Sequence, residues 1–240
     1  MEHDLKRLEL GIEELGIEVT REQLQKFDRY ISLLIQWNKV MNLTAIVEAD
    51  EIMVDHFLDS LSIFKEVKFE GPVSVIDVGT GAGFPGVPIK IMRPEIQLVL
   101  LDSLRKRTEF LSALRDELHL EDVEIIHSRA EDLAKKDDYR EQFDFALSRA
   151  VASLNVLAEY CVPFIKKGGL FISYKGPAAN DELLKARNAI NTLGCKDAYS
   201  LRDAHVPYSD KTRKLVIIKK IALTPKKYPR SPGKIKKSPL

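Results

Sequence analysis

Glycines recur at every second position within the stretch Val75–Phe84, directly after a β-branched segment that contains an acid, Asp77. Glycine has no Cβ, so Gly79, Gly81 and Gly83 can adopt positive φ and let a ligand approach the backbone closely. A helix is expected just beyond the turn, where unpaired N–H groups favour anions. This order of strand, glycine turn and helix predicts a nucleotide-type cofactor site at the carboxyl end of a strand.

The cofactor that this turn would hold is open between two classes. The spacing Gly-x-Gly-x-x-Gly that ends at Gly86 matches the fingerprint of dinucleotide-binding proteins, which predicts an NAD site. Two features favour S-adenosylmethionine (AdoMet) instead. Asp77 stands two residues before the first glycine, where a carboxylate can lie near the methionine ammonium, and Pro85 interrupts the second half of the dinucleotide turn. Either cofactor would use Asp102 to bind ribose hydroxyls, and a tight turn that binds nothing is the third possibility.

Polar residues also follow the next strands, at the edge of the sheet where nucleotide cofactors bind. Asp102 is the first of these, although Asp102 or Ser103 could instead cap the following helix. After the third strand, Ala130 and Glu131 are placed to offer backbone groups to an adenine edge, or to form a capping turn. After the fourth strand, Arg149 could hold a carboxylate or phosphate through two parallel N–H groups, or form a surface ion pair.

Several catalytic and metal-binding patterns are absent from the sequence. There is no Gly-Lys-Ser/Thr phosphate loop, and the five histidines show no zinc spacing, so we expect no metal. His56 lies beside two acids on an expected helix and is interpreted as a structural histidine. Cys161 lies in an apolar helical stretch without an adjacent base and is interpreted as a buried thiol. With Cys195 it indicates neither a metal site nor a disulfide framework.

The positive charge of the chain is concentrated at its C-terminal end. The 240 residues carry a net charge of +1 and are 45% hydrophobic, which indicates one large globular domain or one domain with an extension. After Asp210 there are eleven Lys or Arg residues and no acid, so residues 1–210 carry 26 basic against 36 acidic groups. Such a basic segment predicts contact with a polyanion such as nucleic acid, and a solvated tail is the alternative.

The sequence does not predict a membrane protein or a secreted one. No apolar run approaches the roughly 20 residues that span a bilayer. The first four residues, Met1–Asp4, are acidic overall and are not followed by the apolar core of a signal peptide. We therefore expect a cytoplasmic protein.

Helices are expected to fill the first 65 residues. Thr20 and Gln23 have the spacing of a capping box, and apolar residues follow at three- and four-residue steps. A second helix is expected from about Asp50 to Phe64. After Gly71, apolar segments alternate with helical ones, which predicts βαβ units and a mostly parallel sheet with helices on both faces.

Six strands and three helices are expected in this alternating part. The strands are Val73–Val78, Gln97–Leu101, Val123–Ile126, Phe143–Leu147, Leu170–Tyr174 and Lys214–Lys220, and the helices are Arg105–Leu118, Leu154–Phe164 and Asp181–Leu193. Only the loop-like segment Asp203–Asp210 precedes the last strand, which indicates a hairpin with an antiparallel last strand. The proline-rich residues after Thr224 are expected to form no regular structure.

Seven segments spread over most of the chain match a known family when they are taken in order. They are Trp37–Ile46, His56–Leu61, Asp77–Gly86, Asp102–Arg107, Arg129–Glu131, Arg149–Ala152 and Lys226–Gly233. With them, the chain resembles the RsmG (GidB) family of bacterial 16S ribosomal RNA N7-guanine methyltransferases. The ordered set is far more specific than any single glycine motif. Ser231, where relatives often carry a basic residue, is a minor departure.

The resemblance implies a fold and a domain organisation. The fold would be α/β, that of class I AdoMet-dependent methyltransferases, which is Rossmann-like with a mostly parallel seven-stranded sheet whose last strand is antiparallel. Residues 1–70 would form an N-terminal helical extension packed on the core. Residues 71–223 would form the AdoMet-binding core, and residues 224–240 a basic, proline-rich tail.

The resemblance also implies a reaction and a site. The enzyme would transfer a methyl group from AdoMet to N7 of a guanine in 16S rRNA, as a monomer that acts on the RNA or on the small ribosomal subunit. The predicted cofactor contacts are Asp77, Gly79, Gly81, Gly83, Phe84, Asp102, Ser103, Leu104, Ala130, Glu131 and Arg149, and the predicted RNA contacts are Lys226, Lys227 and Arg230. Two other functions stay open: an NAD-dependent oxidoreductase, and a non-catalytic RNA-binding assembly protein.

Methylation at guanine N7 would need no catalytic base. N7 has an in-plane lone pair and no proton to remove, so the protein would act by orientation, with the reacting atoms in line and about 3–3.5 Å apart. The lack of a catalytic dyad in the sequence agrees with this mechanism. Removal of all residues after Leu223 is expected to spare AdoMet binding and to weaken RNA binding.

Overall fold

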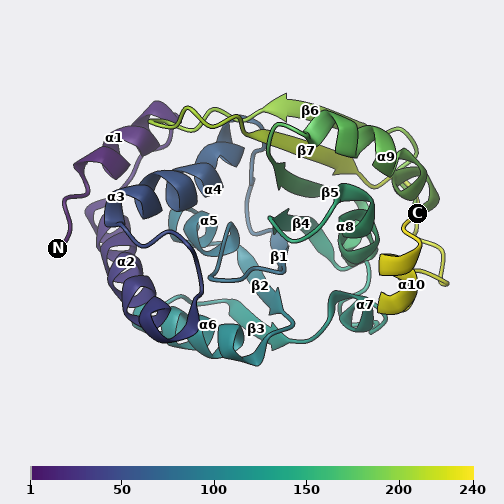
Figure 1. The fold of residues 1–240 in the computed structure, drawn as a ribbon, viewed down its shortest axis with the longest axis horizontal. Helices are drawn as coiled ribbons and strands as arrows, with labels where there is room; N and C mark the ends of the chain where they lie inside the picture. The colour runs from purple at the N-terminus through teal and green to yellow at the C-terminus, as the bar shows by residue number, and fades with distance from the viewer. Residues whose placement is uncertain (1) are drawn as a thin grey trace.

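One seven-stranded sheet forms the centre of the protein (Figure 1). The computed structural model describes residues 2–240. In spatial order the strands are β3 (Val123–His127), β2 (Gln97–Asp102), β1 (Ser74–Val78), β4 (Phe143–Arg149), β5 (Ile165–Lys175), β7 (Lys214–Lys219) and β6 (Tyr199–Asp203). The pairs among β1 to β5 are parallel, and β7 is antiparallel to both of its neighbours. The chain order reverses between β1 and β4, which is where open α/β sheets bind their ligands.

Each of the six predicted strands is confirmed, and the antiparallel last strand is confirmed with them. The sequence analysis does not predict β6, which pairs only with β7 at the edge of the sheet. None of its five residues is fully buried. A strand at the edge is packed less fully than a central one, so the apolar pattern that identifies central strands is weak here.

The helices that follow the strands agree with the predicted alternation. They are α5 (Gly86–Met92), α6 (Arg105–Glu117), α7 (Ala130–Leu133), α8 (Leu154–Cys161), the 3-10 turn η3 (Val162–Phe164) and α9 (Ala179–Thr192). The helix expected beyond the glycine turn is therefore α5, and it begins at Gly86.

Two helices open the chain, α1 (Lys6–Glu14) and α2 (Arg21–Met41). The predicted capping box of α2 is confirmed. The Gln23 N–H donates to Thr20 Oγ1 (3.2 Å), and the Thr20 N–H donates to Gln23 Oε1 (2.9 Å). These two bonds satisfy backbone donors that a helix start leaves unpaired, and they fix where α2 begins.

The next expected helix is confirmed, but its middle is not α-helical. It consists of α3 (Ala49–Glu51), the π-helix η1 (Ile52–Leu58), α4 (Asp59–Leu61) and the 3-10 turn η2 (Ser62–Lys65). π-Helical turns are rare and are frequently found at functional sites. Here the π-helix carries Asp55 and His56, whose backbone carbonyls accept hydrogen bonds from Arg149 at the end of β4.

Helices cover both faces of the sheet, as the sequence predicts. Alternate residues of a strand point to opposite faces. Val75 of β1 lies in an apolar cluster with α1, α2, α5 and α6, whereas Ile76 lies in a second cluster with α7, α8 and α9. The N-terminal helices therefore form part of one of the two layers that bury the sheet (Figure 1).

The expectation that no regular structure follows Thr224 is wrong. Residues Pro232–Lys237 form α10, which begins at a proline after Ser231 in extended conformation. Proline is favoured at the first position of a helix, because that position has no N–H partner within the helix and φ is already fixed near the helical value. The side chain of Ile235 is fully buried, so α10 is packed on the protein rather than free.

Within residues 2–240, none of the helices has the length and apolar character needed to cross a membrane.

Candidate functional site

The glycine turn after β1 has the positive φ values that its sequence predicts, but its glycines meet different surroundings. Gly79, Gly81 and Gly83 have φ of +72°, +62° and +96°. A Cβ on Gly79 would lie 2.6 Å from Val151, and one on Gly83 would lie 2.6 Å from the Tyr30 hydroxyl. A Cβ on Gly81 would meet no atom within 4 Å. The turn therefore presents open space only at Gly81, while the other two glycines allow close packing of protein on protein.

Asp77 lies beneath the turn and holds its shape. Its Oδ2 accepts hydrogen bonds from Thr80 Oγ1 (2.7 Å) and from the Gly86 N–H (2.8 Å). Its Oδ1 is buried and has no hydrogen-bond partner. Burial raises the pKa of Asp77 to about 7, against the opposing effect of those two hydrogen bonds. The unpaired Oδ1 is free to accept one more hydrogen bond, from a ligand group or a water.

Asp102, at the end of β2, joins the turn to the start of α6. Its Oδ2 accepts from the Gly81 N–H (3.0 Å) and from Arg107 Nη1 (3.3 Å), and its Oδ1 accepts from the Leu104 N–H (2.9 Å). Neither Asp102 nor Ser103 caps α6, because Leu104 is the N-cap residue and no side chain caps it. An ionised carboxylate has about four acceptor positions, so Asp102 keeps capacity for one further donor.

A cavity of about 410 Å³ opens at the carboxyl ends of β1 and β2, and we name it the glycine-turn cavity. Its lining residues come from the ends of β1 and β2, from the segments that follow β1 to β4, and from the C-terminal end of the chain. They are Val78, Gly79, Leu101, Asp102, Ser103, Ser128, Arg129, Ala130, Glu131, Val151, Ala152, Ser153, Val156, Tyr160, Lys236 and Pro239. Five predicted cofactor contacts, Gly79, Asp102, Ser103, Ala130 and Glu131, are therefore brought together.

Like Asp102, Glu131 lines this cavity with a carboxylate that can accept a further hydrogen bond. Its side chain is 4% exposed, and its Oε1 has no hydrogen-bond partner. The nearest cation, Nη1 of Arg129, lies 4.0 Å away. A buried acceptor without a donor is costly, so a ligand that donates an N–H or O–H at this position would gain affinity.

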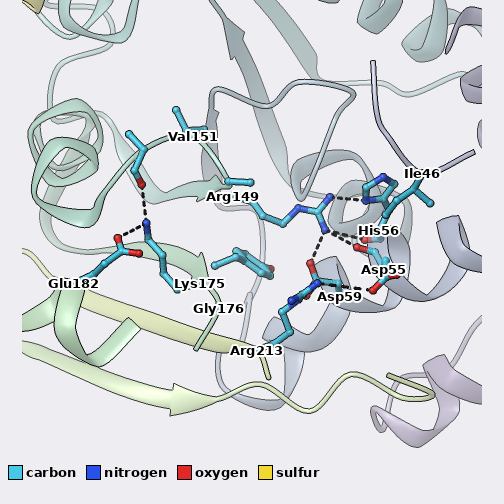
Figure 2. Close-up of a pocket in the computed structure, with 13 residues that line it drawn as sticks. Ile46, Asp55, His56, Asp59, Arg149, Val151, Lys175, Gly176, Glu182 and Arg213 are labelled. Atoms are coloured by element: carbon cyan, nitrogen blue, oxygen red, sulfur yellow. Dashed lines mark hydrogen bonds and ion pairs between the residues drawn. The ribbon is translucent and has the colours of Figure 1, made fainter. Parts of the chain in front are cut away.

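A second cavity of about 590 Å³ lies beside the first, and we name it the arginine cavity (Figure 2). The lining residues come from η1 and α4, from the segments after β4 and β5, and from the start of β7. They are Ile46, Asp55, His56, Asp59, Arg149, Ala150, Val151, Ala152, Tyr174, Lys175, Gly176, Glu182 and Arg213. Val151 and Ala152 line both cavities. The two spaces therefore share one wall.

Arg149 lines the arginine cavity with its guanidinium bound by the protein. Nη1 donates to Asp59 Oδ2 (2.6 Å) and to the backbone oxygen atoms of Asp55 (3.2 Å) and His56 (3.4 Å). The structure thus shows an ion pair, but with a buried acid rather than on the surface, since the Asp59 side chain is 5% exposed. This pair connects the N-terminal helices to the end of β4.

His56 is neutral and has a partner at each ring nitrogen. Arg149 Nη2 lies 3.1 Å from Nδ1, which must accept, so Nε2 carries the proton and donates to Thr44 Oγ1 (2.8 Å). Burial, with the nearby positive charge of Arg149, lowers the pKa of His56 to about 3. The interpretation of His56 as a structural histidine agrees with this geometry.

Each cation of the arginine cavity is paired with an acid of the same cavity. Arg213 Nε donates to Asp59 Oδ1 (3.0 Å), while its Nη2 lies 3.8 Å from Asp55. Lys175 Nζ donates to Glu182 Oε2 (2.8 Å). Together with the Arg149 pair, these contacts leave the lining close to electrically neutral.

Phe84 is not placed in either cavity. Its ring stacks on His56 with centroids 4.4 Å apart and on Tyr30 with centroids 5.3 Å apart, and the Arg149 guanidinium lies 4.9 Å from its centroid. Leu104 is exposed and also lines neither cavity. Phe84 therefore supports the wall of the arginine cavity from behind.

Two of the predicted RNA contacts are exposed at the end of the sheet opposite the cavities. Arg140, which precedes β4, donates to the backbone oxygen atoms of Thr224 (2.8 Å) and Tyr228 (2.9 Å). Lys226 and Lys227 lie between these two anchors, and both are exposed. They are therefore beside the amino end of β4, whereas the cavities open at the carboxyl ends.

Arg230 is held by α8. Its Nε and Nη2 donate to the two carboxylate oxygens of Glu159 (2.9 and 2.7 Å), and its backbone N–H donates to Oε1 (2.8 Å). Glu159 is fully buried, so this pair fastens the C-terminal segment to the sheet domain.

Lys175, Arg213, Lys236 and Pro239 are among the lining residues that sequence reasoning does not single out. Lys175 lies at the end of β5, so the strand-end argument that selects Arg149 could have found it. Arg213, Lys236 and Pro239 carry no local signal, because long-range folding brings them to the cavities. Lys236 and Pro239 place the C-terminal residues at the glycine-turn cavity, against the expectation that AdoMet binding does not need the residues after Leu223.

In the part of the chain that the structure describes, no group of three His, Cys, Asp or Glu residues is suited to hold a metal ion. Cys161 and Cys195 are both buried, and burial raises the pKa of each thiol.

Comparison with known proteins identifies the family. A family model described as rRNA small subunit methyltransferase G (GidB) matches residues 23–207. The chain belongs to this family. The methyltransferase G of Alkaliphilus metalliredigens is 50% identical over 230 residues, 96% of each chain, and that of Clostridium kluyveri is 49% identical over 229 residues, 95% of this chain and 94% of the other. The resemblance, the methyltransferase activity and AdoMet as donor are confirmed, and the NAD-dependent oxidoreductase is excluded.

Solved structures support the fold expected for methyltransferase G. The TYW2 protein of M. jannaschii, solved in complex with AdoMet, is 12% identical with a TM-score of 0.51, over 84% of this chain and 77% of that one. A SAM-dependent O-methyltransferase from Thermotoga maritima is 14% identical with a TM-score of 0.52, over 80% and 73%. At this level of identity the likeness shows the fold alone, and the class I methyltransferase fold is confirmed.

The glycine-turn cavity of this methyltransferase fits AdoMet. Gly81 leaves open space where a Cβ would stand, and Asp102 at the end of β2 can accept from a ribose hydroxyl. Glu131, which lines the cavity, and Asp77, which lies beneath the turn and lines neither cavity, each have a buried oxygen without a partner, and AdoMet carries amino groups that can donate to such acceptors. The donor set therefore suits an adenosine with a charged amino acid attached.

Proposed function

We propose that this protein transfers a methyl group from AdoMet to N7 of one guanine in the 16S rRNA of the small ribosomal subunit. The observation that carries the proposal is the wall of Val151 and Ala152, shared by the glycine-turn and arginine cavities. In this assignment AdoMet binds in the first cavity and the guanine enters the second. The relatives named as small-subunit rRNA methyltransferases support an rRNA substrate.

The glycine-turn residues would hold and orient the donor. Bound AdoMet supplies a methyl group on a sulfonium, which is a good leaving group. Asp102 would accept from the ribose, Glu131 would accept from an amino group, and Asp77 would keep the turn open through Thr80. Because the turn is fixed by these bonds before the donor arrives, little conformational entropy is lost on binding.

The arginine cavity would orient the guanine without removing a proton. N7 has a free lone pair, so no base is needed, and His56 with a pKa of about 3 and two occupied nitrogens is not available as one. The guanine gains positive charge during transfer. Pairing of Arg149, Lys175 and Arg213 with acids keeps the wall from opposing that charge. Alignment within about 3–3.5 Å would lower the barrier by roughly 7–11 kcal/mol.

The RNA would extend beyond the base that enters the cavity. We propose that Lys226 and Lys227, exposed at the other end of β4, bind phosphates further along the RNA or the ribosomal particle. Arg230 would act indirectly, because its guanidinium is taken by Glu159. Within the same proposal the protein is a cytoplasmic monomer.

The direct test is methyl transfer onto 16S rRNA and onto small subunits from cells that lack this protein. Labelled AdoMet should mark one guanine, and the product should show the chemical lability of 7-methylguanine at that position. The Gly81→Val variant serves as the control for enzyme-dependent label. Label at an exocyclic nitrogen or a ribose would refute N7 as the acceptor. No label with either substrate would favour a non-catalytic assembly protein.

A further inference from the structure

The C-terminal helix reaches the cavity assigned to AdoMet. Lys236 of α10 and Pro239 just after it line the glycine-turn cavity together with Asp102 and Glu131. More than 70 residues separate these two from any other lining residue of the cavity. The helix that carries Lys236 packs beside α8 rather than against the strands (Figure 1).

The packing of this segment fixes it in place. Ile235 is fully buried, and Leu240 packs against the apolar cluster that contains α8. Upstream, Arg230 is paired with buried Glu159. A helix of six residues is marginal by itself, so these contacts determine where Lys236 and Pro239 lie.

The opposite surface of the same segment is basic. Lys234 and Lys237 are exposed, and no acid follows Asp210 in the sequence. Cations so placed bind phosphates and release counterions. Unlike Lys226 and Lys227, they belong to the segment that lines the cavity.

We propose that residues 232–240 form a wall of the AdoMet site and that RNA phosphates bound to Lys234 and Lys237 raise the affinity for the donor. The inference rests on the proposed function, since it takes RNA as the polyanion. RNA contact on the outer side would favour the packed position of α10 over any opened one, and the packed position is the one that completes the cavity. Thermodynamic linkage then requires the donor to raise RNA affinity by the same factor.

Calorimetric titration of the full-length protein with AdoMet tests the wall. Lys236→Ala removes a lining side chain, and Ile235→Asn unseats α10 by placing an amide in an apolar site. We expect about fivefold weaker binding for the first and about tenfold weaker for the second. Lys185→Ala, an exposed lysine on α9 that lines neither cavity, should bind like the wild type. If Ile235→Asn proves unfolded by thermal melting, Lys236→Ala decides.

The coupling is tested with S-adenosylhomocysteine, so that no methyl transfer occurs during the titration. Saturating 16S rRNA should tighten its binding to the wild type by about threefold or more, and the variant with both Lys234→Ala and Lys237→Ala should lose that gain. Wild-type AdoMet affinity in Lys236→Ala and in folded Ile235→Asn, or no effect of RNA on the wild type, would overturn the inference. The site of methylation plays no part in these titrations, so an acceptor other than guanine N7 would sink the proposed function alone.

Discussion

Asp77 and Asp102 are both buried, but only Asp102 lines the glycine-turn cavity, so the two aspartates serve the site in different ways. Asp77 turns inward beneath the glycine turn and binds Thr80 and the Gly86 N–H. Asp102 stands at the cavity edge and binds the Gly81 N–H from outside. The sequence predicts both as cofactor contacts, Asp77 from its place two residues before the first glycine and Asp102 from its place at the end of the next strand. It cannot predict that Asp77 acts through the turn, since that depends on where the turn folds back.

Gly81→Val should abolish AdoMet binding, because the added side chain would enter the open space where the donor approaches. Gly16→Val is the matched control: Gly16 also has positive φ (+78°) and open space, but it lies in the segment after α1 and not in the turn whose Gly79 lines the glycine-turn cavity and whose Gly81 N–H donates to Asp102. Both variants should carry a backbone strain of roughly 1–2 kcal/mol. Calorimetry with AdoMet separates them, and equal affinity in two folded variants would show that Gly81 is not on the donor path.

Asp77→Asn should remove the part of the pH dependence of stability that Asp77 causes. In the wild type, burial holds the pKa of Asp77 near 7, against an ordinary value of 3.8, so the unfolded chain releases this proton first. Its contribution to stability is complete below pH 4, falls by at most about 1.4 kcal/mol per pH unit between pH 4 and 7, and is constant above pH 7. Asparagine can still accept from Thr80 and Gly86 through its oxygen.

Urea denaturation at several pH values measures the Asp77 effect as a difference between variant and wild type. The difference is needed because His56 acts with the opposite sign: its lowered pKa makes the folded state more stable as pH rises towards 6.5. The stability of Asp77→Asn relative to the wild type should increase from pH 4 to 7. A difference that stays constant over this range would show that Asp77 is ionised in the folded protein.

At the scale of elements, local patterns predict much of the fold, and long-range packing determines the rest. The capping box at Thr20 and the apolar central strands are visible because neighbouring residues alone determine them. The π-helical turns of Ile52–Leu58 are not visible in the sequence, and their carbonyls contact Arg149, which is 93 residues from His56 in the chain. The same holds for α10, whose residues fold against α8.

Arg230→Ala should lower the free energy of unfolding, because it leaves the buried carboxylate of Glu159 without its cation. Breaking a buried ion pair costs about 3–5 kcal/mol, and the loss here should lie at or below that range because Arg230 is 22% exposed. Arg187→Ala is the matched control. Its pair with Asp197 spans 3.9 Å with both side chains more than half exposed, so less than about 1 kcal/mol should be lost. Equal losses in urea denaturation would show that the Glu159 pair does not hold the tail.

At the scale of the whole molecule, the site is assembled from segments that are distant in the sequence. The N-terminal helices supply Asp59 and His56, the strand ends supply Arg149 and Asp102, and the last residues of the chain supply Lys236. The sequence predicts the strand-end group, because parallel strands bring their carboxyl ends to one edge. It does not predict the contributions from the two ends of the chain, because local sequence patterns do not indicate where on the sheet domain these segments pack.

The proposed RNA contacts at Lys226 and Lys227 can be tested through the salt dependence of RNA affinity. Each phosphate that a lysine neutralises adds about 0.7 to 0.9 to the slope of log affinity against log salt concentration. If Lys226 and Lys227 bind phosphates, replacing both with alanine should weaken binding to 16S rRNA and reduce that slope by about 1.4–1.8. AdoMet affinity should stay unchanged, because neither residue lines the glycine-turn cavity.

Lys68 and Lys167 provide the control for this pair. Both are exposed, and their double alanine variant removes the same charge near the start of β5, the strand that pairs in parallel with β4. A general loss of positive charge would weaken RNA binding equally in the two double variants, whereas phosphate contact at Lys226 and Lys227 lowers the slope only in the first. Filter binding at four or more salt concentrations distinguishes these results. If the slope of log affinity against log salt concentration is the same for the wild type and both double variants, Lys226 and Lys227 do not bind RNA phosphates. The cations of α10 would then be the main candidates for RNA contact.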